Sequence, residues 1–277
     1  MKKAKVLILA GQSNAVGVGY TKYMREHFDD ATVKDFINGY ENVLINYFSH
    51  YIYSNGFVKT RINCTERDKD TLGPEVGIAK YLNEHFPDQK FFLIKCAIGG
   101  TNLYHDWLSP STDGYLLNTH KGQSVADLNN DRKDNGGWCY NELIKIVNES
   151  LSILQAQGYT PQITNFFWMQ GESDSDFIET AENYIKRFDA FYNDFKVEFS
   201  SYLEKCVLVD AGISSRWKFF KEINSQKKDY AKNKGHIYLD TIKEGLTTTN
   251  EPKEQPDTAH YDCDSTVKLG ELFASFV

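Results

Sequence analysis

The sequence has few of the residues that mark disulfide-rich or metal-binding proteins. Its five cysteines are odd in number and form no CxxC pair: Cys64, Cys96, Cys139, Cys206 and Cys263. Cys96 and Cys206 lie in apolar segments, where a free cysteine behaves as a small hydrophobic residue. This pattern indicates a reducing compartment or incidental cysteines. The seven histidines show no metal-ligand spacing, so no metal site is expected.

Long apolar runs and basic clusters are also absent. No run approaches the ~20 apolar residues that a membrane-spanning helix needs. The apolar run after Met1-Lys2-Lys3 covers only about five residues, which is too short for the core of a signal peptide. With a net charge of −7 and no Lys/Arg-rich helix, nucleic acid is not an expected partner. We expect a chain that is cytoplasmic, or exported with its signal already removed; its oligomeric state stays open.

What the sequence does contain is an alternation of strand-like and helical segments. Its 277 residues, 41% apolar and 25% charged, suit one globular domain covering residues 1–277. The pattern predicts α/β architecture: a three-layer αβα sandwich with a central, roughly five-stranded parallel sheet. Strands are predicted near residues 5–10, 91–97, 163–169, 207–209 and 237–240, and helices near 20–28, 72–86, 138–157, 176–199, 216–233 and 264–276. The aperiodic segments around 29–70 and 104–137 are interpreted as loop insertions.

Small polar residues follow three of the predicted strands. They are residues 12–14 after the first strand, 99–101 after the second and 170–174 after the third. Parallel strands bring their carboxyl ends to one edge of a sheet, where open α/β folds bind ligands. Ser13 by itself is also typical of a plain helix N-cap. The three segments together favour a shared site at this edge.

A fourth segment, Asp257-Thr258-Ala259-His260, stands just before the last predicted helix. At this spacing a carboxylate can hold one ring nitrogen of the histidine and leave the other free to act as a base. A serine hydroxyl needs such a base to become a nucleophile. Ser13, His260 and Asp257 are therefore candidates for a catalytic triad. The alternative for the last two is a helix N-terminal turn with a surface histidine.

The four segments follow the order of the sequence blocks of the SGNH (GDSL-like) hydrolases. The GQSN form at 11–14, the LGPE segment at 72–75 and the WMQGESD form at 168–174 resemble one branch of that superfamily. This branch contains the sialate O-acetylesterases and the carbohydrate esterase family 6, or acetylxylan esterase-like, enzymes. The resemblance covers nearly the whole chain and implies the flavodoxin-like fold of the SGNH hydrolases.

The resemblance implies an enzyme, a carboxylic ester hydrolase that removes O-acetyl groups from a carbohydrate. Sialic acid and xylan-type glycans are the two leading substrates, and the sequence does not choose between them. Ser13 would be the nucleophile, His260 the general base and then acid, and Asp257 the group that orients it. The reaction would proceed through an acetyl-enzyme and would need no cofactor.

The resemblance also implies an oxyanion hole, formed by the backbone N–H groups of Ser13 and Gly100 and the side chain of Gln170. Donors placed there are worth a few kcal/mol each, because negative charge develops on the former carbonyl oxygen. Gly99 is the alternative for the second donor. The wider superfamily carries Asn where this chain has Gln170, so the longer side chain departs from the common pattern.

Four further residues are candidates for substrate binding: Gln12, Asn14, Glu172 and Trp107. Three roles are open for Glu172: it could support the histidine, contact the substrate, or stabilise the start of a helix, where a negative charge is favoured. Trp107 is suited equally to stacking on a sugar ring and to packing in the core. The roles of Glu172 and Asp174 stay open at this point.

Three other functions compete with this interpretation. The same chemistry could serve an SGNH esterase or thioesterase that acts on non-sugar acyl esters. The chain could instead be a carbohydrate-binding pseudoenzyme, although the apparently complete triad argues against that. A nucleotide-binding protein is disfavoured, because Gly17-Val18-Gly19 lacks the spacing of a phosphate-binding loop.

Overall fold

The computed structural model describes residues 2–62, 70–115, 136–203 and 205–277. The strands of its main sheet are β1 (Lys2–Gly11), β3 (Tyr40–Ser49), β4 (Ile52–Tyr53), β5 (Val58–Thr60), β7 (Phe91–Ala97), β8 (Tyr159–Met169), β9 (Val207–Ala211) and β10 (Ile237–Leu239). A separate antiparallel pair consists of β2 (Gly19–Tyr20) and β6 (Thr71–Leu72). The helices are α1 (Ser13–Val16), α2 (Met24–His27), α3 (Asp30–Asn38), α4 (Pro74–His85), α6 (Trp138–Ala156), α7 (Ile178–Glu182), α8 (Tyr184–Glu198), α9 (Phe220–Lys234) and α10 (Cys263–Ala274).

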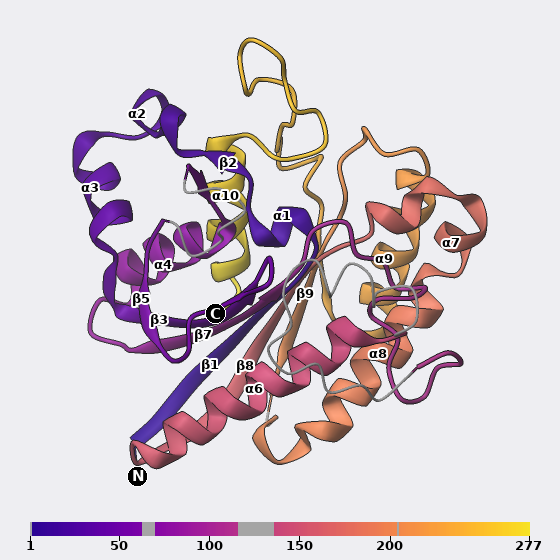
Figure 1. Ribbon diagram of the computed structural model, residues 1–277, viewed down its shortest axis with the longest axis horizontal. Coiled ribbons are helices and arrows are strands. Elements are labelled where there is room, and N and C mark those ends of the chain that lie inside the picture. Colours follow the sequence, from indigo (N-terminus) through magenta and orange to yellow (C-terminus); the bar gives the residue numbers. More distant parts are fainter. Residues whose placement is uncertain (1, 63–69, 116–135, 204) are drawn as a thin grey trace.

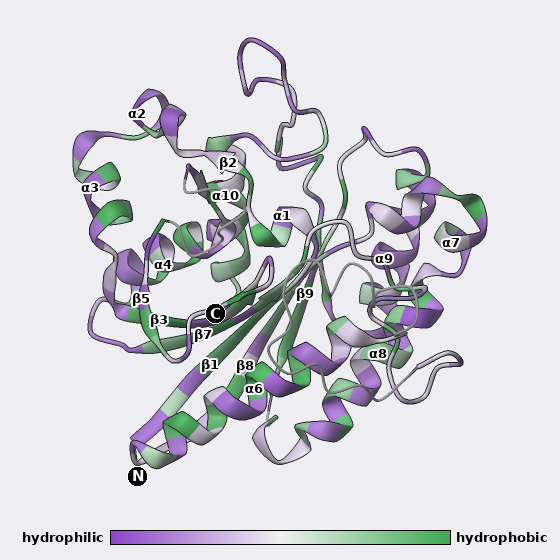
Figure 2. Ribbon diagram, viewed as in Figure 1, coloured by the Kyte–Doolittle hydropathy of each residue, from purple (hydrophilic) through white to green (hydrophobic). Residues whose placement is uncertain are grey.

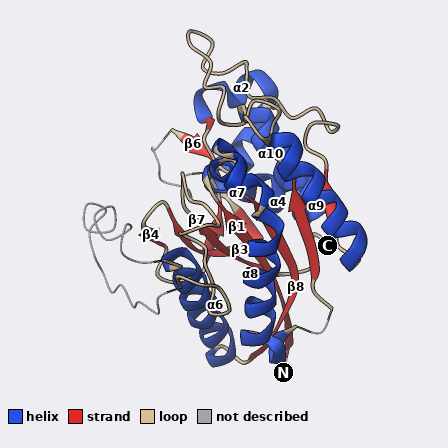
Figure 3. Ribbon diagram, turned by 90° about the vertical axis from the view of Figure 1, so that its right-hand side faces the viewer, coloured by secondary structure: helices blue, strands red, loops and turns tan. Residues whose placement is uncertain are grey.

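Helices cover both faces of the sheet, so the predicted three-layer αβα architecture is confirmed (Figures 1 and 3). The strand order is β10-β9-β8-β1-β7-β3-β4, with β5 paired to β3. All five predicted strands are present and pair in parallel with their neighbours. The third of them begins earlier than predicted, because Pro161 continues β8 opposite Ala4 instead of ending the preceding helix.

The segment around 29–70 is not the loop insertion that the sequence suggested. It contains α3 and the strand β3, which pairs in parallel with β7 from Val43 opposite Phe91 to Ser49 opposite Ala97. Polar residues mask this strand in the sequence; Asn46, for example, is buried and donates a hydrogen bond to Ser150 Oγ. Of the other predicted insertion, residues 116–135 lie outside the described part, and residues 104–115 contain no helix or strand.

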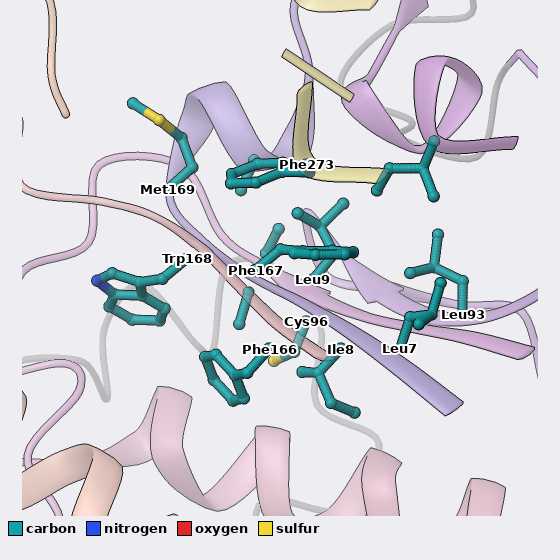
Figure 4. Packing of buried hydrophobic residues seen from close by; sticks show 14 of the residues in the cluster. Leu7, Ile8, Leu9, Leu93, Cys96, Phe166, Phe167, Trp168, Met169 and Phe273 are labelled. Atoms are coloured by element: carbon teal, nitrogen blue, oxygen red, sulfur yellow. The ribbon is translucent and has the colours of Figure 1, made fainter. Parts of the chain in front are cut away.

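The core lies on both faces of β1, whose residues Val6 to Ala10 are completely buried. On one face Phe167 stacks on Phe273 of α10, with ring centroids 5.1 Å apart (Figure 4). On the other face Phe166 packs edge-on against Phe195 of α8. Figure 2 shows the matching sequence pattern, with largely hydrophobic central strands and helices that alternate in hydropathy. This burial on both faces explains why the strand is an unbroken apolar run.

The sheet register aligns the ends of the three central strands. Gly11 at the end of β1 pairs with Ala97 of β7 on one side and with Met169 of β8 on the other. Gly11 has φ +146°, and a Cβ there would lie 1.9 Å from the Met169 carbonyl oxygen, so only glycine fits. The polar segments after these strands therefore begin at the same level of the sheet.

Two further features of the described residues bear on the sequence predictions. None of the described helices is long and apolar enough to cross a membrane. Cys96, Cys139 and Cys263 are buried, and Cys206 is half-buried.

Candidate active site

Ser13 lies at the carboxyl edge of the sheet, at the start of the short helix α1. We call residues 12–14 the Ser13 turn, residues 98–103 the glycine loop and residues 251–262 the histidine loop. The Ser13 side chain is 7% exposed, and its Cβ lies 3.7 Å from the position that a Cβ would take at Gly99. The fold thus places the serine beside the glycine loop, as the sequence predicted from the strand ends.

The histidine loop contains a hydrogen-bonded aspartate and histidine. His260 Nδ1 lies 2.7 Å from Asp257 Oδ2, and the two side chains are 16% and 29% exposed. An ionised carboxylate only accepts hydrogen bonds, so the tautomer of the neutral ring that fits this contact has its proton on Nδ1 and its lone pair on Nε2. The Ala259 N–H donates to Asp257 Oδ1 at 3.0 Å and fixes the carboxylate further. This is the pairing predicted from the spacing of the two residues.

Asn14 joins the histidine loop to the Ser13 turn. The Tyr261 N–H donates to Asn14 Oδ1 at 3.0 Å, and Asn14 Nδ2 donates to Glu172 Oε1 at 2.7 Å. Asn14, Glu172 and Tyr261 are all buried. The residue after the histidine is therefore bonded to the residue after the serine, which brings His260 and Ser13 to the same site.

Gln12 makes the corresponding connection on the other side of Ser13. Its Oε1 accepts hydrogen bonds from Gln170 Nε2 and from the Ser173 N–H, both at 3.2 Å. Gln170 Nε2 also lies 3.1 Å from the Thr101 carbonyl oxygen in the glycine loop. The Ser13 turn, the glycine loop and the segment after β8 are thus joined by one buried amide.

Asp174 completes this second network. Its carboxylate accepts from Gln170 Nε2 at 2.7 Å and from the Leu103 N–H, which lies 3.1 Å from Oδ1 and 3.0 Å from Oδ2. Burial raises the pKa of Asp174 to about 7 against the opposing effect of these hydrogen bonds. The carboxylate holds the end of the glycine loop against the segment that follows β8.

A buried lysine on α9 also holds the segment that follows β8. Lys227 Nζ of α9 donates to the carbonyl oxygens of Gln170 at 2.6 Å and Ala211 at 2.7 Å, and to Asp210 Oδ1 at 2.7 Å. Burial raises the pKa of Asp210 to about 6, although the ammonium beside it acts in the opposite direction. Lys227 thus fixes the backbone of Gln170, and this backbone positions the Gln170 side chain in the site.

A second buried lysine supports α1. Lys95 Nζ donates to the Val16 carbonyl oxygen and to Glu75 Oε2, both at 2.7 Å. Neither Lys95 nor Lys227 could be recognised from the sequence, because a lysine in an apolar strand or on an amphipathic helix carries no local signal of its partner. Asp174, by contrast, belongs to the WMQGESD motif at residues 168–174.

The structure disagrees with the predicted role of Gln170 as an oxyanion donor. Its amide nitrogen has two hydrogens and faces three protein oxygens, those of Gln12, Thr101 and Asp174. The side chain is also completely buried. No N–H of this amide is left for a substrate, so the geometry gives Gln170 the task of positioning the glycine loop.

Of the two roles that the sequence left open for Trp107, the structure supports packing in the core and not stacking on a sugar ring. The side chain is 0% exposed, and its Nε1–H donates to Thr101 Oγ1 at 2.9 Å. Its ring packs edge-on against Trp168 with centroids 5.2 Å apart. A ring without an open face has no surface to offer a sugar. Gln12, Asn14 and Glu172, also predicted to contact substrate, are buried and bind protein groups.

No curated protein sequence compared with this chain matches it, whereas a protein-family model does. The model described as "Carbohydrate esterase, sialic acid-specific acetylesterase" matches residues 3–277. The chain belongs to this family. It is therefore a carbohydrate O-acetylesterase whose substrate is an acetylated carbohydrate, which confirms the enzyme class and the family inferred from the sequence blocks.

Solved structures with the same fold cover almost the whole chain. A protein of Arabidopsis thaliana is similar with a TM-score of 0.66 and 17% identity, over 99% of this chain and 97% of its own. NanS is similar with a TM-score of 0.65 and 17% identity, over 99% and 98%. A carbohydrate acetylesterase from Xanthomonas citri is similar with a TM-score of 0.55 and 11% identity, over 98% of this chain and 55% of its own. At these identities the likeness concerns the fold.

Proposed function

We propose that the chain is a serine esterase that removes O-acetyl groups from sialic acid-type glycans through an acetyl-enzyme intermediate. Ser13 is the nucleophile, His260 the general base and Asp257 the residue that orients the imidazole. The observation that carries the proposal is the 2.7 Å hydrogen bond between Asp257 and His260, on a loop bonded to the Ser13 turn. This is the arrangement that a serine hydroxyl requires for activation.

In the first half of the reaction, His260 Nε2 accepts the proton of the Ser13 hydroxyl while Oγ attacks the acetyl carbonyl carbon. The tetrahedral intermediate then expels the sugar oxygen, which receives that proton from His260. In the second half a water molecule gives a proton to His260 and attacks the carbonyl carbon of the acetyl-enzyme. The bond to Ser13 Oγ then breaks, Oγ takes that proton back from His260, and the product leaves as acetic acid, which ionises to acetate in water. Asp257 keeps the ring in the tautomer that both halves need.

The oxyanion hole consists of the backbone N–H groups of Ser13 and Gly100, with Gly99 as the alternative to Gly100. The first N–H groups of a helix have no partner within it, and Ser13 is the first residue of α1. The glycine loop is held by the Leu103–Asp174 and Thr101–Gln170 hydrogen bonds. Donors fixed before substrate arrives stabilise the developing negative charge without a cost of reorganisation.

The choice of sialic acid over xylan rests on the description of the family, which names sialic acid-specific acetylesterases. Acetate release from 4-nitrophenyl acetate, O-acetylated sialic acid and acetylated xylan tests both the chemistry and the substrate. We expect release from the first two and a lower kcat/KM for xylan. A higher kcat/KM for xylan would reassign the sugar, and a preference for longer acyl chains would favour an esterase of non-sugar substrates.

The Ser13→Ala variant tests the nucleophile. Loss of the triad serine lowers kcat by about 10⁴-fold or more, because only binding and the oxyanion hole remain. Ser200→Ala, at an exposed position outside the site, is the matched control and keeps wild-type activity. Full activity of Ser13→Ala would refute the mechanism. A folded wild-type protein that binds acetylated sugars without turnover would instead support the pseudoenzyme.

A further inference from the structure

Glu172 is a buried carboxylate that the proposed reaction does not use. Its Oε1 accepts the hydrogen bond from Asn14, whereas its Oε2 has no hydrogen-bond partner within the described residues. Burying a carboxylate oxygen without a partner costs free energy. Glu75 and Asp210 also have such an oxygen, but each is paired with a buried lysine, whereas the hydrogen-bond partner of Glu172 is Asn14 beside Ser13. Burial also raises the pKa of Glu172.

The Asn14 side chain has both a hydrogen-bond donor for Glu172 and an acceptor for the Tyr261 N–H. Its amide nitrogen faces the Glu172 carboxylate, and its amide oxygen accepts from the Tyr261 N–H. These partners fix which end of the amide is nitrogen, because a carboxylate accepts and an N–H donates. An alanine would lose both hydrogen bonds, and an aspartate would turn an oxygen towards Glu172. The carboxylate therefore determines how Asn14 holds the histidine loop.

The Asp257–His260 pair cannot by itself fix the histidine relative to the serine. Both residues stand on the same loop, three positions apart, so they can move together without breaking their hydrogen bond. The Asn14–Tyr261 hydrogen bond joins that loop to the Ser13 turn. Glu251 and Asp262 hold the two ends of the histidine loop, where the Cys263 N–H donates to Glu251 and the Glu251 N–H donates to Asp262. The Asn14 hydrogen bond acts on the backbone directly beside the imidazole, so it contributes to where the ring lies relative to Ser13.

We propose that Glu172 is a positioning residue for His260, which acts through Asn14 and the Tyr261 backbone. Its carboxylate holds the Asn14 amide in one orientation, and this amide holds the histidine loop at the distance that proton transfer from Ser13 needs. The inference rests on the proposed function, because it assigns Glu172 a part in the same reaction. It treats the hydrogen bond, and not the charge, as the contribution of Glu172.

The test compares Glu172→Ala, Glu172→Gln and Asn14→Ala in the hydrolysis of 4-nitrophenyl acetate. Glu172→Ala and Asn14→Ala lower kcat by about 100-fold with KM nearly unchanged, since a small misplacement of a reacting group has an effect of this size. Glu172→Gln keeps an oxygen that accepts from Asn14, so it restores most of kcat. The double variant of Asn14 and Glu172 is no worse than either single variant, because both changes remove one connection.

A matched control separates positioning from a general loss of folding. Glu142 on α6 is also buried, and its carboxylate accepts from the Tyr53 hydroxyl outside the site. Glu142→Ala keeps wild-type kcat although it also removes a buried carboxylate. The fraction of molecules that a serine-directed phosphonate finally labels counts the folded sites in each variant. Labelling is complete but slow in Glu172→Ala.

Three results would overturn the inference. One is wild-type kcat in Glu172→Ala, and the second is an equal loss in the glutamine and alanine variants, which would make the charge decisive. The third is a loss of kcat that matches the loss of labelled sites, which would make the role purely structural. Ser13→Ala in the same assay separates this inference from the proposed function. Its full activity would refute the serine mechanism, whatever the Glu172 variants show.

Discussion

The two neighbours of Ser13 hold opposite sides of the site, and they do so differently. On the Gln12 side the carboxylate of Asp174 has hydrogen-bond donors at both of its oxygens. On the Asn14 side the carboxylate of Glu172 accepts from one side chain, and one of its oxygens has no partner in the described structure. Among the described residues, several hydrogen bonds hold the glycine loop, and one amide, that of Asn14, joins the histidine loop to the Ser13 turn.

The two sides differ because the Gln12 side holds the oxyanion donors, whereas the Asn14 side holds the histidine. Oxyanion donors must be fixed before the substrate arrives, and a dense buried network provides that rigidity. The histidine only needs its ring nitrogen within reach of the Ser13 hydroxyl. We therefore expect changes on the Gln12 side to lower both stability and activity, and changes on the Asn14 side to lower mainly activity.

The largest effect is expected within the histidine loop itself. Asp257→Asn removes the acceptor that holds the ring proton on Nδ1 and lowers kcat by about 10⁴-fold, as loss of the correct histidine tautomer does in serine hydrolases. Steady-state hydrolysis of 4-nitrophenyl acetate measures the change. Thermal unfolding of the variant near the wild-type midpoint shows that the fold is intact. A loss below about tenfold would contradict the role of Asp257.

The next largest effect is expected on the Gln12 side. Gln170→Ala removes the amide that joins Gln12, Thr101 and Asp174, so the glycine loop loses its fixed position. We expect kcat to fall by about 10²- to 10³-fold, the effect of losing an oxyanion donor. The midpoint of urea unfolding falls as well, because buried polar groups lose partners. A fall in kcat at unchanged stability would show instead that Gln170 itself donates to the oxyanion.

The buried carboxylate on the Gln12 side also predicts a pH dependence of stability. Asp titrates near 3.9 in an unfolded chain, whereas burial raises the pKa of Asp174 to about 7 in the fold. Between these values the folded state keeps a proton that the unfolded state has released. The free energy of unfolding therefore falls as the pH rises through this range, by about 1.4 kcal/mol for each unit of pKa difference.

Asp174→Asn tests this pH dependence. The variant shows a flatter dependence of the unfolding free energy on pH between about 4 and 7, although part of the slope remains because burial also raises the pKa of Asp210. Urea titrations at several pH values measure the slope. Asp88→Asn, at an exposed position, is the control and keeps the wild-type slope. An unchanged slope in Asp174→Asn would contradict the prediction.

The smallest effect is expected from Trp107→Phe, which tests whether this ring packs in the core. The change removes the hydrogen bond to Thr101 and part of a buried ring, so the free energy of unfolding falls by about 1–3 kcal/mol. The KM for acetylated sugar stays the same, because the ring has no exposed face. A several-fold rise in KM at unchanged stability would restore the sugar-stacking role.

Much of the fold could be predicted from the sequence, because the central strands are buried on both faces. The runs that became β1, β7, β8 and β9 carry this signal directly, whereas β10 is a partly buried edge strand that was predicted from its short apolar run. β3 was missed because its burial depends on long-range partners. Asn46, for instance, donates a hydrogen bond to Ser150 of α6, and no local sequence pattern predicts that contact.

The site could be predicted in part. The strand ends place Ser13 beside the glycine loop, and the spacing of Asp257 and His260 predicts their hydrogen bond. The partners of Gln170 could not be predicted, since three segments that are distant in the sequence provide them. For Trp107 the sequence left stacking and packing equally open, because a loop residue that folds back into the core has the same local sequence pattern as an exposed one.

Trapping the acetyl-enzyme tests the central claim most directly. Wild-type protein is mixed with excess 4-nitrophenyl acetate, quenched with acid within the first turnover, digested and analysed by mass spectrometry. The account predicts one acetyl group on the peptide that contains Ser13, and none on that peptide in Ser13→Ala. An acetyl group on another residue, or turnover by Ser13→Ala at the wild-type rate, would contradict the account.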